Sequence, residues 1–173
     1  LGVNQSGFGR EGFMGGANWG AGRTNGQPSR SRTLHAGTPG WGAGWKSVIA
    51  EWYGHSINIG THGAVMAYKT NHLDLAPTYK DPHGRPLMRM TFNWNPNEIR
   101  MTQFMKGKAE ELAKTMNPDL MQSSFKKEGA QFDVRPYQTT HTTGGHTMSA
   151  NPREGVVNRF SQAWDKHNVF MLG

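Results

Sequence analysis

Apolar residues recur at helical spacing in two stretches of the chain. The first covers residues 41–52 and stops before Gly54, which stands where a left-handed C-cap belongs. Its repeating residues are Trp41, Trp45, Val48, Ile49 and Trp52. The second begins at Asn95-Pro96-Asn97-Glu98, which supplies a cap, a proline at the first helical position and a glutamate that reaches back. Its apolar face runs from Met101 to Met116, where Asn117-Pro118 ends the helix. Both stretches predict amphipathic helices, the first with an aromatic stripe that packs in the core.

Alternation of apolar and polar residues predicts strands in the rest of the chain. Residues 71–75 and 87–92 alternate on either side of Asp81-Pro82-His83-Gly84, which is the clearest hairpin pattern in the sequence. The other predicted strands are residues 56–59 and 64–68, joined through 60–63, then 131–135 and the apolar run 169–173. Strands of this kind interspersed with helices predict an α+β fold, a mixed, largely antiparallel sheet with helices packed on one face.

The first 40 residues are rich in glycine and poor in apolar side chains. Thirteen of the 23 glycines fall in residues 1–44, so we predict an irregular segment of residues 1–40 ahead of the ordered fold. Residues 7–12 match the nucleotide-binding pattern G-x-G-x-x-G. That pattern requires a strand before it and a helix at its end, and neither is predicted there, so we reject the match.

Composition narrows the classes of partner. Nineteen Lys and Arg against twelve Asp and Glu give a net charge of +7, a balance that favours nucleic acid, anionic lipid or acidic substrates. The basic residues are dispersed, however, and we expect no nucleic-acid binding. The chain has no cysteine, which excludes disulfides and thiolate chemistry within it. His141 and His146 straddle two glycines and have no evident third ligand, so no metal site is expected.

Candidate chemistry concentrates in one stretch, His141-Thr142-Thr143-Gly144-Gly145-His146-Thr147-Met148. It places a histidine, whose pKa suits proton transfer near neutral pH, against two glycines that let a backbone approach a flat ligand. A loop histidine beside glycines is, by itself, more often a turn residue that bonds to backbone. Asn151-Pro152 and Val156-Val157 follow the stretch at short spacing.

The order His-x-x-Gly-Gly-x-x-Met, Asn-Pro, Val-Val, Asn168 and a final apolar run ending in Gly173 resembles the C-terminal block of glucose-methanol-choline (GMC) flavin oxidoreductases. The resemblance is greatest to sugar and sugar-acid dehydrogenases of the gluconate 2-dehydrogenase large-subunit type. It extends to residues 37–42, to Trp45-Lys46 and to the Asn95 motif, and so covers nearly the whole chain.

The resemblance implies an FAD-dependent enzyme that oxidises a hydroxyl of a sugar, sugar acid or related alcohol by proton abstraction and hydride transfer. The implied roles are His141 as catalytic base, Gly144, Gly145 and Gly173 in contact with FAD, and Thr140 and Thr142 in contact with substrate. Ser149 stands where the family usually has glycine, and we expect a polar group there to narrow the pocket.

The resemblance also implies an arrangement of domains. Residues 41–173 would form the GMC substrate domain, and the chain would end before the second catalytic residue, a His or Asn about two dozen residues beyond the last strand. A fragment of this kind lacks the nucleotide-binding half, so by itself we expect it neither to hold FAD nor to turn over substrate.

The implied partners are a cytochrome c subunit and a small accessory subunit, in a periplasmic enzyme associated with the membrane through those subunits. The electron acceptor stays open between cytochrome, quinone and oxygen. Two other classes of function also stay open: a carbohydrate-binding module that stacks sugars on Trp41, Trp45, Trp52 and Trp94, and a basic nucleic-acid-binding protein.

Overall fold

The chain forms two compact units in a computed structural model that describes residues 2–6, 11–23, 37–135 and 144–172. The first unit is Leu1–Met66 with Asn95–Ala130, and the second is Ala67–Trp94 with Gln131–Gly173. The strands are β1 (Gly2–Ser6), β2 (Gly16–Arg23), β3 (Ile57–Gly63), β4 (His72–Lys80) and β5 (Pro86–Thr91). The helices are α1 (Gly42–Trp52) and α2 (Pro96–Lys114), and the α+β class is confirmed.

The first unit contains an antiparallel sheet in the order β1-β2-β3. Two predictions were wrong here. The irregular segment predicted over residues 1–40 contains β1 and β2, and the link predicted at residues 60–63 lies inside β3, while 64–68 form no strand. The reason is pairing: β2 bonds to β3 from Ala17 opposite Gly63 to Arg23 opposite Ile57, and a backbone ladder overrides the weak strand propensity of glycine.

The rejected nucleotide-binding pattern does follow a strand, contrary to our expectation, because β1 ends at Ser6. The described residues after the pattern form no helix and lead into β2, which runs antiparallel to β1. A dinucleotide site needs a helix N-terminus at this point. We therefore reject a dinucleotide site at this pattern only because the described residues directly after it form no helix.

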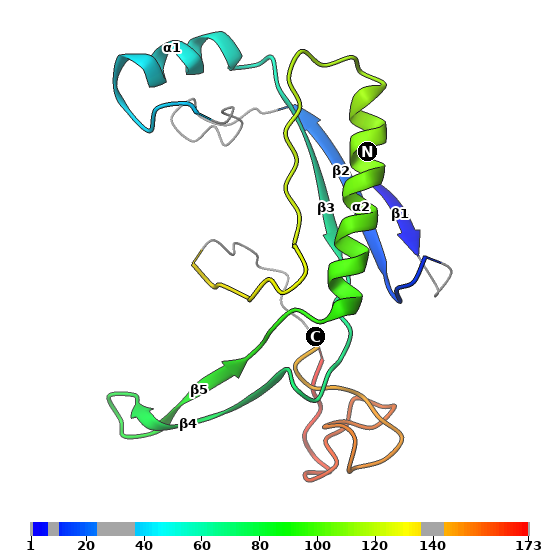
Figure 1. Cartoon of the computed structure of the whole chain (residues 1–173). Coiled ribbons are helices and arrows are strands. Elements are labelled where there is room, and N and C mark those ends of the chain that lie inside the picture. The colour runs from blue at the N-terminus through cyan, green and yellow to red at the C-terminus, as the bar shows by residue number, and fades with distance from the viewer. Residues whose placement is uncertain (1, 7–10, 24–36, 136–143, 173) are drawn as a thin grey trace. The chain divides into compact units, whose positions relative to one another are not determined.

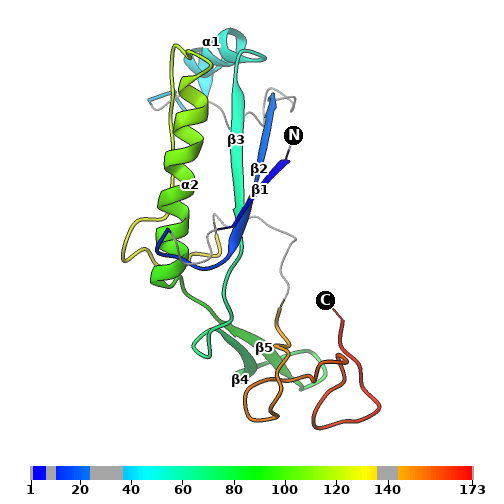
Figure 2. The same cartoon turned by 90° about the vertical axis from the view of Figure 1, so that its right-hand side faces the viewer.

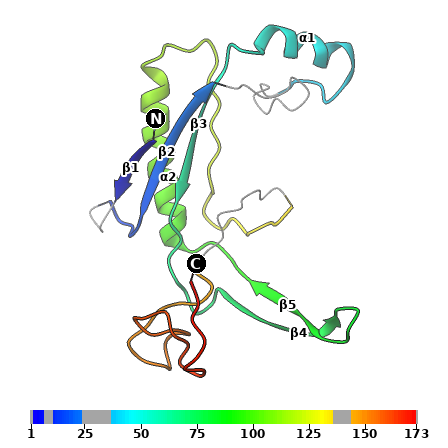
Figure 3. The same ribbon diagram turned by 180° about the vertical axis from the view of Figure 1, so that it is seen from behind.

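Helix α2 lies along one face of this sheet (Figures 1 and 2), and the view from behind shows the strands in front of it (Figure 3). The core between helix and sheet is formed by Phe13, Ala17, Met101 and Met105, all buried. Phe104 packs against it with its ring centroid 5.5 Å from that of Phe13. The prediction of a helix on one face of an antiparallel sheet is confirmed.

The start of α2 follows the predicted capping pattern. Glu98 is only 2% exposed, and its carboxylate accepts hydrogen bonds from the backbone N–H groups of Asn95 and Met66, both at 3.2 Å. The helix ends at Lys114, before the predicted Asn117-Pro118. Its second half is less buried than predicted, since Leu112 is 43% exposed.

Helix α1 is confirmed within one residue, and Gly54 has a φ of 82°, as a left-handed C-cap residue requires. The apolar stripe predicted along α1 is only partly buried. Ile49 is buried, but Trp41 is 86% exposed. The core-packing interpretation is therefore wrong for Trp41.

The second unit is built around the predicted hairpin, which is confirmed as β4 and β5. Asp81 closes its turn by accepting the backbone N–H groups of His83 (2.8 Å) and Arg85 (2.9 Å). Leu73 pairs with Met90 and Leu75 with Met88, so these four apolar residues share one face. Asp74 pairs with Arg89 on the opposite face. The described strands thus form two antiparallel sheets, where we predicted one.

Two further strand predictions in this unit were wrong. Residues 131–135 form no strand, and of the run 169–172 only Phe170 makes an isolated bridge, to Gln162. In the first case side chains take the hydrogen bonds that a neighbouring strand would otherwise make. Asn93 Oδ1 accepts the N–H of Phe132, and the carboxylate of Asp133 accepts the N–H of Arg135.

Candidate functional site

The predicted site is described from Gly144 onward. His141, Thr140, Thr142 and Gly173 lie outside the described residues. Gly144 has a φ of 82°, which favours glycine, and a side chain added there would meet none of the described residues within 4 Å. The positive φ is therefore the described reason for a glycine at this position. Its contact with FAD stays a prediction.

Gly145 has a different reason to be glycine. A Cβ at this position would come within 3.3 Å of Leu73 Cδ1, on the apolar face of the β4–β5 hairpin. The bare backbone thus lets the motif lie close against β4. This contact explains the second glycine without a ligand, and a role in cofactor binding remains a prediction for Gly145 as well.

The downstream end of the motif is fixed by backbone pairing with residues 156 and 157. Ser149 N–H donates to Val157 O at 2.9 Å, and Val156 N–H donates to Thr147 O at 2.8 Å. Val157 is among the most deeply buried residues of the described chain. These bonds anchor the motif to the Val-Val pair that follows it in the sequence.

Gly155 makes this pairing possible, and sequence analysis missed it. A Cβ on Gly155 would lie 2.5 Å from Thr147 O and 2.6 Å from Ser149 Oγ, far inside normal contact distance. Only glycine permits the two segments to approach this closely. The signal in the sequence was a glycine immediately before Val156-Val157, which our sequence analysis did not single out.

The side chain of Ser149 is occupied within its own loop. Its Oγ donates to the carbonyl of Asn151 at 2.7 Å and lies 3.4 Å from Trp164 Nε1. A hydroxyl bonded in this way braces the loop from residue 149 to 151. The expectation that Ser149 narrows the substrate pocket stays a prediction.

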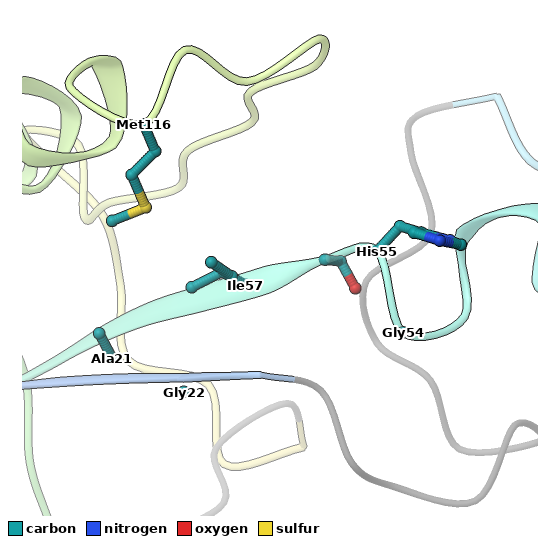
Figure 4. Close-up of a pocket in the computed structure, with 7 residues that line it drawn as sticks. Ala21, Gly22, Gly54, His55, Ile57 and Met116 are labelled. Carbon is teal, nitrogen blue, oxygen red and sulfur yellow. The ribbon is translucent and has the colours of Figure 1, made fainter.

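A separate shallow pocket of about 580 Å³ lies in the first unit, where α1 meets β3 (Figure 4). It is lined by Ala21, Gly22, Gly54, His55, Ser56, Ile57 and Met116. His55 Nδ1 lies 2.9 Å from Glu51 O, so one ring nitrogen is bound to backbone. The pocket contains none of the predicted site residues, and its lining offers no paired acid and base.

Within the described residues, no group of three or more His, Asp or Glu side chains is placed to hold a metal ion. Because His141 lies outside that part of the chain, the absence of a metal site stays a prediction. Among the same residues, neither helix has the length and apolar character needed to cross a bilayer.

Comparison with known proteins places these features in a wider context. The sequence pattern of the family described as GMC oxidoreductase matches residues 67–173. The chain is 43% identical over 162 residues to the gluconate 2-dehydrogenase flavoprotein of Pantoea cypripedii, a match that covers 94% of this chain and 26% of that protein.

Two more distant relatives have related names. The chain is 26% identical to the 2-methyl-1,2-propanediol dehydrogenase of Mycolicibacterium austroafricanum over 93% of this chain and 28% of that protein. It is also 26% identical to the fructose dehydrogenase large subunit of Gluconobacter japonicus over 68% of this chain and 20% of that protein. The chain therefore spans about a quarter of the length of the relatives it matches.

Proposed function

Since the chain belongs to the GMC oxidoreductase family, we propose that it is part of a larger flavoprotein that oxidises a hydroxyl of a sugar, sugar acid or related alcohol. The observation that carries this proposal is the match of residues 67–173, which includes the entire histidine motif. The names of the three relatives, all dehydrogenases, support the reaction class.

In the proposed reaction His141 takes the proton of the substrate hydroxyl. Oxidation of an alcohol requires this proton to leave as the carbon gives up hydride, and a neutral imidazole has a suitable pKa for a base at this step. FAD, when bound, supplies the hydride acceptor. Gly144 and Gly145, with Gly173, would border the cofactor, and Thr140 and Thr142 would orient the substrate.

The apolar face of the hairpin supports a larger protein. Leu75 and Met88 are 65% and 71% exposed, and their neighbours on that face, Leu73 and Met90, are about half exposed. A two-stranded hairpin is only marginally stable by itself in water, so we expect a further part of the protein to cover this face. We infer that this part belongs to the same polypeptide, because three-quarters of the gluconate dehydrogenase relative lies outside the match.

The test is His141→Ala in the full-length flavoprotein. We expect kcat to fall by about 10²- to 10⁴-fold, the usual contribution of a general base, while the flavin absorbance near 450 nm is retained. His146→Ala is the matched control, five residues away in the same motif, and should leave kcat within about threefold. Undiminished turnover by His141→Ala with retained flavin would contradict the proposal.

We propose, further, that the 173-residue chain by itself binds no FAD. The proposal is supported by residues 13–15, which lead from the glycine pattern directly into strand β2 and not into a helix. Stoichiometric flavin on the purified chain would contradict it.

One observation favours the carbohydrate-binding alternative: the 86% exposure of Trp41 at the start of α1. An exposed indole is suited to stacking on a sugar ring. In that case Trp41→Ala would abolish sugar binding by the isolated chain, and the full-length protein would carry no flavin. The flavin spectrum therefore separates the two functions.

For partners and location we propose a cytochrome c subunit, a small accessory subunit and a periplasmic, membrane-associated complex. The names of two relatives, a flavoprotein and a large subunit, support a multi-subunit enzyme. Purification of the full-length protein from its native membranes tests this. Co-elution of a haem absorbance with the flavin supports the cytochrome, and a flavoprotein that elutes alone contradicts it.

A further inference from the structure

The apolar run of residues 169–172 in the second unit is paired along one edge. Ala163 N–H donates to Val169 O at 2.9 Å, and Met171 N–H donates to Ser161 O at 2.8 Å. Both bonds lie on the same side of the run, as in an antiparallel ladder. The sequence predicted a strand here, and this chain supplies hydrogen-bond partners for one side of it.

The other edge of the run is open among the described residues. Successive residues of an antiparallel ladder direct their backbone groups to opposite sides, so those of Phe170 and Leu172 point away from residues 161–163. Within the described part of the chain, the N–H and C=O of Phe170 and the N–H of Leu172 form no hydrogen bond. These groups are placed to pair with a strand on the outer side.

The side chains of the run are apolar on both faces. Phe170 is 61% and Leu172 85% exposed on one face, and Val169 is 40% exposed on the other. Uninterrupted apolar runs are typical of strands that a sheet buries on both faces. Residues 169–172 contain no charge or proline of the kind that protects an exposed edge. The run therefore has the composition of an interior strand and the surroundings of an edge strand.

A cover for these side chains must also pair the backbone. Any layer that buries Phe170 and Leu172 removes their backbone groups from water, and a buried N–H or C=O without a partner is strongly destabilising. A helix packed on the run would cover the side chains and leave those groups unpaired. A neighbouring strand meets both needs, because it supplies hydrogen bonds in the plane of the sheet and side chains beside the run.

We propose that residues 169–172 pair with a further strand, which belongs to the part of the same polypeptide outside this chain. This inference deepens the proposed function and rests on it. The match covers 26% of the gluconate 2-dehydrogenase relative, so a flavoprotein of similar length has ample chain to supply the strand. In that protein the run is an interior strand of a sheet to which both parts of the polypeptide contribute.

Hydrogen exchange of the full-length, FAD-loaded enzyme, measured by mass spectrometry at single-residue resolution, tests the pairing. The amides of Phe170 and Leu172 should exchange about 100-fold or more slowly than that of Arg159, because the amides of a paired strand open only with their sheet. Arg159 is the matched reference, since its amide also forms no hydrogen bond within the described residues and lies on a turn. Exchange of Phe170 and Leu172 as fast as that of Arg159 overturns the inference.

Two phenylalanines of similar exposure provide a second test. Phe160 lies on the same turn as Arg159 and is 64% exposed, against 61% for Phe170. We expect Phe170→Asp to lower the yield of flavin-loaded full-length enzyme by about tenfold or more, because it buries a carboxylate beside the added strand. Phe160→Asp should stay within about twofold of the parent enzyme. Equal yields of the two variants contradict the proposed pairing.

The oligomeric state decides whether a second copy of the protein takes this place. If slow exchange of Phe170 and Leu172 is confined to dimers of the full-length protein and is absent from the monomer, the edge pairs with a second copy and the inference is wrong. The proposed function fails by another result, undiminished turnover of His141→Ala. The two failures are distinguishable, because the exchange of these amides is measured without turnover.

Discussion

The two units of this chain are ordered by different means. In the first unit a 19-residue helix packs on a three-stranded sheet. The buried residues of this unit include Phe13, Met101 and Met105, which form one apolar cluster. In the second unit the buried apolar residues are small and few: Ala76, Val157 and Ala163 among those described. Its loops are held by side chains bonded to backbone and by glycines at points of close approach.

The difference explains where the candidate chemistry lies. Apolar packing fixes the volume of a core but tolerates exchange of one apolar side chain for another of similar size. A hydrogen bond to a particular backbone N–H fixes the position of that backbone, and its loss leaves a polar group without a partner. The described end of the histidine motif belongs to the second unit, where bonds of this kind join Thr147 and Ser149 to Val156 and Val157.

The largest effect on stability should come from the core of the first unit. Met105→Ala removes a side chain that is 3% exposed and packed in the cluster, and we expect it to cost about 2–5 kcal/mol of unfolding free energy. Leu112→Ala, on the same helix but 43% exposed, should cost less than about 1 kcal/mol. Urea denaturation measures the free energy of unfolding of both variants, and hydrogen exchange of the α2 amides is a second probe. Equal losses would contradict the asymmetric burial of α2.

The next prediction compares the loss of stability when one glycine of each unit is replaced by alanine, and the expected losses are smaller. A Cβ on Gly155 would meet the carbonyl oxygen of Thr147 at 2.5 Å, and backbone cannot move aside cheaply. A Cβ on Gly63 would meet Met101 Cε at 2.6 Å, the mobile end of a long side chain. We therefore expect Gly155→Ala to cost about 1–3 kcal/mol, and Gly63→Ala to cost less than about 1 kcal/mol because alanine suits a strand better than glycine.

Thermal unfolding of the two variants, with NMR of the amides of Ser149 and Val156, tests this contrast. Gly155→Ala should shift both amides, since they make the two bonds between the paired segments. If Gly63→Ala lowers stability more than Gly155→Ala does, then Met101 cannot move aside and the second unit tolerates an added Cβ better than the first.

The sequence predicted the elements that are determined by residues close together in the chain. The capping pattern at Asn95, the spacing along both helices and the turn at Asp81 each depend on residues a few positions apart, and all three appear in the structure. The strand β2 was missed because its pairing with β3 joins residues about 40 positions apart, and nothing in its glycine-rich composition favours a strand.

The candidate site was predictable as a motif but not as a geometry. The order of His141, the glycines and Val156-Val157 identified the family, since spacing along the chain is what such a pattern records. The brace formed by Ser149 and Trp164 and the reach of Asn93 to Phe132 join residues 15 and 39 positions apart. Serine and asparagine have partners of many kinds, so their types alone did not predict these bonds.

The smallest predicted effect is an acid sensitivity of the β4–β5 hairpin. Arg89 Nε donates to Asp74 Oδ1 at 2.7 Å, and this hydrogen bond, with the guanidinium charge, lowers the pKa of Asp74 below its ordinary value of 3.8. A lowered pKa in the folded state means that the pair's contribution is complete above 3.8 and is lost as the pH falls through the lowered value. Both side chains are partly exposed, so the contribution is modest and is reduced by salt.

NMR titration of the Asp74 carboxyl carbon, with the cross-strand amides of β5 as a second probe, measures this directly. We expect a midpoint below 3.8 for Asp74 and a matching change in the hairpin amides. In Asp74→Asn the change should vanish, because the amide does not titrate in this range, while the Met88 and Leu75 pairing on the other face persists. A midpoint at or above 3.8 would mean that the hairpin depends on its apolar face alone, and the second unit would then resemble the first in being held by packing.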